Sequence, residues 1–176
     1  MSQCVETLKE WTGTSNVSIL FDSTVDEFTD DSLFQRVANK PDIAIVGFTT
    51  DGDVFGGYFH VRVTAQDEMV HDPDHFIFTF ECHGRCATPQ RFLVKAEQKD
   101  DAKVRFFKDD SGGWFVDFGL LNFFVVGFGN EKSDTFCFNP SIAYDGIEDS
   151  TLTGTNTNPY YSKRHHCFRL LGLWLQ

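Results

Sequence analysis

The chain has 176 residues, 41% hydrophobic and 23% charged, a composition typical of one globular domain with its own core. Its formal net charge of −11 repels phosphate backbones and anionic lipid surfaces, so we expect no nucleic-acid binding and a partner with a basic surface. The first residues lack the pattern of a signal peptide, and no apolar stretch is long enough for a membrane helix. We therefore predict a cytoplasmic protein without membrane insertion, whose five cysteines are reduced thiols.

The chain opens with apolar residues at helical spacing over residues 3–11, which predicts a short helix. Residues 1–14 are interpreted as a lead-in and residues 15–176 as one domain, and whether this helix packs on the domain stays open. A strand is predicted over residues 17–22. A second helix is predicted over residues 31–39, where Asp30 or Thr29 supplies the cap.

Residues 42–63 predict a buried hairpin with its turn at Asp51-Gly52. The first arm is apolar on both faces, as in strands that are covered on both sides. The second arm alternates, so that Tyr58, His60 and Arg62 point away from the core side. Gly56 and Gly57 in this arm are expected to permit close approach of another strand or sheet.

The rest of the chain, with 20 phenylalanines, is dominated by short strands about ten residues apart. We expect a loop over residues 64–74, another over 82–89, a five-residue hairpin loop over 109–113, an irregular segment over 139–164 and a central final strand over 167–175. Further strands are predicted over residues 76–81, 92–94, 104–107, 114–118, 120–128 and 135–138. This count predicts a mainly β fold, a sandwich of two packed antiparallel sheets with about two short flanking helices.

His71, His75, Cys82 and Cys86 are residue types that bind zinc. The predicted strand between the two pairs holds them roughly 20 Å apart, at ~3.3 Å per residue. A zinc site is therefore not expected, and the histidines are interpreted as loop residues.

Cys82 and Cys86 alone flank a tight turn, where their sulfurs can approach each other. A reversible disulfide there makes a peroxide sensor or a thiol-based redox enzyme, with His83 and Arg85 favouring the thiolate. Two incidental cysteines are the alternative.

Other motifs are incomplete. Residues 51–53 and 109–111 lack the acidic spacing of a calcium loop and are interpreted as turns. The chain has no Gly-x-Ser-x-Gly motif, and residues 127–129 lack the third glycine of a dinucleotide loop. Residues 165–167 are interpreted as the lead into the last strand, with one of the three facing inward. We thus predict no catalytic, cofactor-binding or metal-binding residues.

Residues 51–58, Asp-Gly-Asp-Val-Phe-Gly-Gly-Tyr, combine an Asp-Gly turn with a following Phe-Gly-Gly. This stretch looks like the signature of the TLDc domain family, and several other segments resemble that family in the correct order. Residues 8–13 are similar to the lead-in of shorter, single-domain protist-type members. Further similar segments are residues 19–23, 31–37, 76–80, 127, 136–140 and 168–175.

The resemblance implies a two-sheet sandwich without catalytic machinery, a role in resistance to oxidative stress, and binding to the vacuolar proton-pumping ATPase (V-ATPase). We therefore expect a non-enzymatic interaction domain whose contact face is the acidic surface and the loop of residues 144–161. The alternatives are the thiol redox protein based on Cys82 and Cys86, and a sandwich that binds a small ligand.

Overall fold

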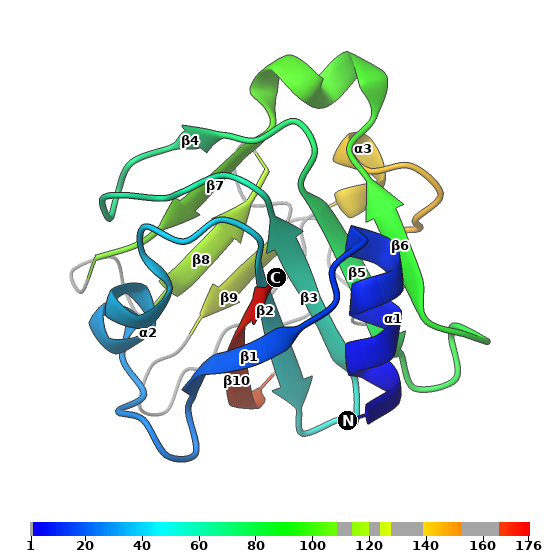
Figure 1. Cartoon of the computed structure of the whole chain (residues 1–176). Helices are drawn as coiled ribbons and strands as arrows, with labels where there is room; N and C mark the ends of the chain where they lie inside the picture. The colour runs from blue at the N-terminus through cyan, green and yellow to red at the C-terminus, as the bar shows by residue number, and fades with distance from the viewer. Residues whose placement is uncertain (1, 109–113, 120–123, 128–138, 153–165) are drawn as a thin grey trace.

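The computed structural model describes residues 2–108, 114–119, 124–127, 139–152 and 166–176, which form two antiparallel sheets with short helices at their margins (Figure 1). The six-stranded sheet has the order β1 (Val17–Asp22), β10 (Cys167–Leu175), β2 (Ile43–Thr49), β3 (Val54–Phe59), β5 (Phe76–Glu81) and β6 (Gln90–Leu93). The four-stranded sheet has the order β4 (Val70–His71), β7 (Lys103–Phe106), β8 (Trp114–Phe118) and β9 (Phe124–Gly127). The helices are α1 (Ser2–Thr12), α2 (Asp30–Val37), the 3-10 helix η1 (Ala96–Asp101) and α3 (Pro140–Ala143). The predicted β-sandwich is confirmed.

The predicted hairpin is confirmed as β2 and β3, which pair along their whole length. Its turn contains Gly52 at φ +89, a conformation that glycine adopts without a steric cost. The final strand is central, as predicted, because β10 lies between β1 and β2. The cap of α2 is Thr29, whose side-chain oxygen accepts a hydrogen bond from the Ser32 amide.

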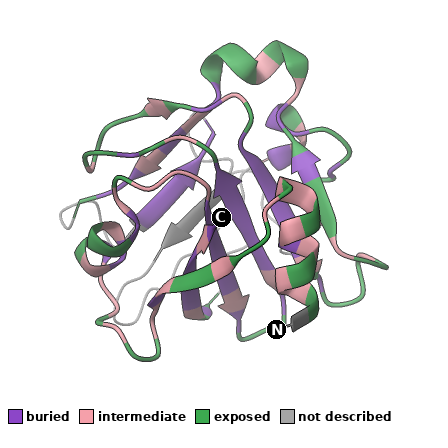
Figure 2. Cartoon of the chain, in the orientation of Figure 1, coloured by how far each residue is buried: buried purple, intermediate pink, exposed green. Residues whose placement is uncertain are grey.

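The two sheets pack through a core of mostly aromatic and β-branched side chains, and Figure 2 shows the central strands as buried. Gly57 of β3 lies close to the opposite sheet. A β-carbon built on it would lie 2.5–2.7 Å from the Phe118 ring of the opposite sheet. A β-carbon on Gly56 would lie 2.0 Å from the Ile45 carbonyl oxygen. The expectation of close approach at both glycines is confirmed.

Helix α1 covers the outer face of the six-stranded sheet, which answers the question that the sequence left open. Leu8 is fully buried there, and the Trp11 ring stacks on Phe80 with centroids 5.8 Å apart. Trp11 also contacts Phe76 and Phe78. The sheet is therefore buried on both faces, which explains the doubly apolar sequence of β2.

That cover also buries part of the second hairpin arm. Tyr58 points away from the core between the sheets, as predicted, and it is only 7% exposed because it stacks on Phe76 in the layer under α1. Its hydroxyl donates to the Asp42 carboxylate at 2.7 Å. Moreover, β3 ends at Phe59, so that His60 lies beyond the strand and is exposed.

Two expectations are wrong in detail. The segment 64–74 holds the two-residue strand β4, which is too short to produce a periodic pattern. The segment 139–164 begins with α3, which Asn139 precedes at φ 44 and which has Pro140 in its first turn. The predicted loop 109–113, most of the predicted strand 120–128 and the strand 135–138 lie outside the described residues.

Candidate functional site

The loop between β5 and β6 carries a disulfide between Cys82 and Cys86, with the two α-carbons 5.7 Å apart. Left-handed backbone at His83 and Gly84 turns the chain tightly enough to bring the two sulfurs together. The expectation that all five cysteines are reduced is therefore wrong for this pair. The predicted approach of the two sulfurs is observed. Cys82 is fully buried, whereas Cys86 is partly exposed.

Arg85, within the same loop, anchors it to the rest of the domain. Its guanidinium donates to the Asp53 carboxylate at 2.7 Å, and Asp53 is 1% exposed at the start of β3. The same guanidinium donates to the carbonyls of Thr151 at 3.1 Å and Leu152 at 2.9 Å. Because Asp53 is buried and Arg85 is its ion-pair partner, the loop conformation and the β2–β3 turn depend on each other.

An open cleft of about 230 Å³ borders this loop on the side of α1. Cys4 of α1 and Cys86 both line it, together with Gln3, Phe80 and the loop residues up to Pro89. Cys4 is a partly exposed free thiol. The cleft therefore brings a free thiol to the accessible half of the disulfide, and sequence reasoning missed this because the two residues are far apart in the chain.

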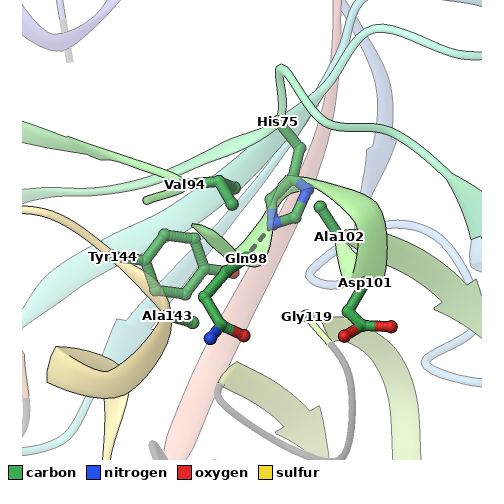
Figure 3. A pocket seen from close by; sticks show the side chains of 8 residues that line it. All are labelled: His75, Val94, Gln98, Asp101, Ala102, Gly119, Ala143 and Tyr144. Carbon is green, nitrogen blue, oxygen red and sulfur yellow. Dashed lines mark hydrogen bonds between the residues drawn. The ribbon is translucent and has the colours of Figure 1, made fainter. Parts of the chain in front are cut away.

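His75 and Tyr144 form a buried polar pair at the other end of β5 (Figure 3). The Nδ1 atom of His75 donates to the Asp72 carbonyl at 2.6 Å, and its Nε2 atom accepts from the Tyr144 hydroxyl at 2.8 Å. Burial lowers the pKa of His75, so the ring is neutral and carries one proton. That proton is on Nδ1, because the Asp72 carbonyl can only accept a hydrogen bond, and Nε2 is then the acceptor for the Tyr144 hydroxyl. Tyr144 is 1% exposed, so this end of the predicted contact loop 144–161 does not belong to a contact face, and residues 153–161 of that loop lie outside the described residues.

The hollow that His75 and Tyr144 both line is too small to hold a substrate, whereas His75 alone also lines an open cleft of about 270 Å³. The volume of the hollow is about 10 Å³, enough for about one water molecule. The residues drawn in Figure 3 close around it. We interpret His75 and Tyr144 as a structural hydrogen-bonded pair that joins β5 to the segment after α3.

The four zinc-type residues of the sequence do not come together. His75 is buried at the start of β5, whereas Cys82 follows its end and is bonded to Cys86. Among the described residues, no group of three or more histidine, cysteine, aspartate or glutamate side chains is placed to hold a metal ion. Cys167 is buried, so one residue of the segment 165–167 does face inward, and His166 is exposed.

A family model for the TLDc domain matches residues 1–101, more than half of the 176 residues. The chain belongs to the TLDc family. No curated protein matches it. The matched range includes α1, both arms of the β2–β3 hairpin and the disulfide loop, so the helix that covers the sheet lies within the part that resembles other TLDc domains.

An apolar groove of about 340 Å³ lies on the outer face of the TLDc sheet, beneath the first half of α1. Its lining is entirely apolar apart from one thiol, and is made by Cys4, Val5, Leu8, Val17, Ile19, Val46, Phe48, Val54, Phe80, Leu171 and Leu173. Its volume is at the lower end of the range of ligand pockets, roughly 300–1,000 Å³. A small-ligand site therefore stays a prediction, and the groove under α1 is where it would lie.

The TLDc domain also carries an acidic face around η1, the green helical turn at the top of Figure 1. We define this acidic face by five exposed residues, namely Asp74, Glu97, Asp100, Asp101 and Asp145. Lys99 pairs with Asp74 at 3.2 Å, which leaves four carboxylates without an ion-pair partner in the described part of the chain. An open cleft of about 270 Å³ between Asp74 and Asp145 includes the half-exposed Leu93. No helix of the described residues is long and apolar enough to cross a membrane.

Proposed function

We propose that this TLDc domain is a non-enzymatic cytoplasmic interaction module that acts in oxidative-stress resistance and engages the V-ATPase. Membership in the TLDc family is the observation that carries the proposal, since the resemblance implies both roles. The net charge of −11 supports a partner with a basic surface.

The acidic face supplies the contact surface in this proposal, in place of the buried Tyr144. Carboxylates that lie within about a Debye length of one another, ~8 Å at physiological salt, act together on a basic partner. Such a surface raises the association rate and makes it salt-dependent. Half-exposed Leu93 adds an apolar contact at the centre of the same surface.

The test is affinity capture of V-ATPase subunits by the full chain from cell lysate, with and without peroxide. The wild type is compared with a variant in which Glu97→Gln, Asp100→Asn and Asp101→Asn are combined. A matched control removes three charges elsewhere, through Glu10→Gln, Glu27→Gln and Glu68→Gln, all at exposed positions. We expect capture by the wild type and the control, and loss with the η1 variant. Absence of pump subunits under both conditions refutes the pump role, and equal capture by both variants refutes the acidic face.

A thiol redox function is the second candidate, and the Cys82–Cys86 disulfide favours it. Oxidation by a hydroperoxide would convert the Cys86 thiolate to a sulfenic acid with release of water or alcohol. The Cys82 thiol would then displace hydroxide from that sulfur to form the disulfide and a second water. Reduction by a dithiol returns both thiols.

Differential thiol labelling before and after mild peroxide tests this candidate. In the reduced wild type we expect both cysteines to lose labelling together after peroxide. Cys82→Ser is the control: without the Cys82 thiol, Cys86 cannot form the disulfide with residue 82. Unchanged labelling of Cys82 and Cys86 in the wild type contradicts a thiol redox function.

A further inference from the structure

We infer that Cys4 is the third thiol of a three-cysteine exchange site, in which it attacks the Cys82–Cys86 disulfide and becomes bonded to Cys86. This inference rests on the thiol redox function proposed as the second candidate. It is carried by the shared cleft, which Cys4 and Cys86 line from two elements more than eighty residues apart in the chain.

Access decides which sulfur is attacked. Cys86 is partly exposed and lines the cleft, whereas Cys82 is 0% exposed and does not. A nucleophile that approaches through the cleft therefore meets the Cys86 sulfur, and Cys82 is the leaving group. Cys4 is a free thiol with a partly exposed side chain, so it can enter the cleft.

The exchange conserves the number of disulfides and needs no external oxidant. The Cys4 thiolate forms a bond to Cys86 Sγ while the Cys82–Cys86 bond breaks. The electron pair of that bond leaves with Cys82 as a thiolate, which takes up the proton that Cys4 released. A dithiol reductant of the cell then reduces the Cys4–Cys86 bond and is itself oxidised to a disulfide, which leaves three thiols at the site. A hydroperoxide then re-forms the Cys82–Cys86 bond, through the steps given for the redox function.

The packing of α1 allows its first half to move toward the loop. The side chains that hold the helix to the sheet, Leu8 and Trp11, lie in its second half. The first half, with Cys4 and Val5, borders the apolar groove of about 340 Å³ on one side and the cleft on the other. The first turn of α1 therefore has space on two sides, and the Cys4–Cys86 bond would fasten it to the β5–β6 loop.

The exchange also reaches the segment after α3. The loop that would shift contains Arg85, which holds the Asp53 carboxylate and the carbonyls of Thr151 and Leu152. Movement of Cys86 toward α1 pulls on the neighbouring Arg85. Formation of the Cys4–Cys86 bond would thus shift the hydrogen bonds of Arg85 to Asp53 in the β2–β3 turn and to the carbonyl of Leu152.

Disulfide mapping by mass spectrometry of the full chain tests the inference. The wild type and two single variants, Cys82→Ser and Cys86→Ser, are reduced, exposed to a mild hydroperoxide, trapped with an alkylating agent and digested. In the wild type we expect a Cys4–Cys86 peptide beside the Cys82–Cys86 peptide, with free Cys82 thiol appearing in equal amount, and absence of the Cys4–Cys86 peptide there overturns the exchange. In Cys82→Ser, where peroxide oxidises Cys86 directly, we expect a Cys4–Cys86 peptide and a matching loss of Cys4 labelling. In Cys86→Ser we expect no Cys4–Cys82 peptide, because Cys82 is buried, and Cys4 should keep its labelling. Far-ultraviolet circular dichroism confirms that both variants are folded before the comparison.

The wild type separates failure of this inference from failure of the redox function. A Cys82–Cys86 bond that forms with peroxide, together with no Cys4–Cys86 peptide in Cys82→Ser, overturns the role of Cys4 and leaves the redox function standing. No peroxide-dependent bond at Cys82 or Cys86 in the wild type overturns both. A Cys4–Cys82 peptide in Cys86→Ser, equal in amount to the Cys4–Cys86 peptide, also overturns the role that access gives to Cys86.

Discussion

Gly57→Ala tests whether the two sheets are held at a separation that only glycine permits. The added β-carbon would lie 2.5–2.7 Å from three atoms of the Phe118 ring. Phe118 is fully buried and packs against Phe59 and His75, with ring centroids 6.3 and 6.0 Å away. The ring cannot swing aside without displacing these neighbours. Overpacking of this kind costs about 1–3 kcal/mol, and we expect Gly57→Ala to lie near the upper end of that range.

Urea unfolding followed by far-ultraviolet circular dichroism measures this cost, and a second substitution identifies its source. Phe118→Leu alone leaves a cavity and should destabilise the domain. The double variant Gly57→Ala/Phe118→Leu relieves the clash, since the smaller side chain leaves space for the new methyl group. We expect its loss of stability to be smaller than the sum of the single losses by about 1 kcal/mol or more. Additive losses, or a Gly57→Ala variant as stable as the wild type, would refute the close contact between the sheets.

Three more outcomes are expected. Gly56→Val should abolish the folded state, because the β-carbon of the new side chain would lie 2.0 Å from the Ile45 carbonyl oxygen of β2. A soluble Gly56→Val protein with a cooperative unfolding transition would contradict this prediction. Arg169→Gln should lower the free energy of unfolding at pH 7 by about 1 kcal/mol, because Arg169 forms two hydrogen bonds to Asp22 and holds its pKa at about 2 instead of 3.8. The stability from a lowered carboxylate pKa is present above pH 3.8 and lost as the pH falls toward 2, so the two proteins should converge in acid urea titrations. Burial lowers the pKa of His75, so below about pH 6.5 the unfolded chain binds a proton that the folded chain does not. The free energy of unfolding of the wild type should therefore fall with falling pH, by up to about 1.4 kcal/mol per pH unit. Thermal melts at pH 5–7 should show a smaller pH dependence for His75→Gln than for the wild type.

Local patterns of the sequence determine most of the strands and their approximate burial. The β2 sequence has no polar side chain from Ile43 to Phe48, and the structure buries both faces of the strand. The Asp-Gly turn predicts a hairpin because glycine adopts the positive φ that the turn requires, and Gly52 does so. The central place of β10 follows from the same argument, since its sequence is apolar on both faces apart from Arg169.

Features that depend on packing between distant segments could not be predicted in this way. The alternation in the second hairpin arm places Tyr58 on the face opposite the core between the sheets, and only the cover of that face decides that it is buried. Tyr144 lies in a polar stretch that resembles a surface loop, yet its hydroxyl meets the ring of His75, 69 residues earlier in the chain. Neither contact leaves a local signal, because periodicity reports the exposure of a face and not which element covers it.

For the candidate site, too, some features could be predicted from the sequence and others depend on tertiary packing. The turn between Cys82 and Cys86 is short, so the sequence by itself determined that these two sulfurs can meet. Tertiary structure decided that Cys82 is buried and Cys86 accessible, and that α1 brings Cys4 to the same cleft. The reason is physical: a disulfide across a tight turn depends on local backbone geometry, whereas the approach of a third thiol depends on how the first helix packs on the finished sheet.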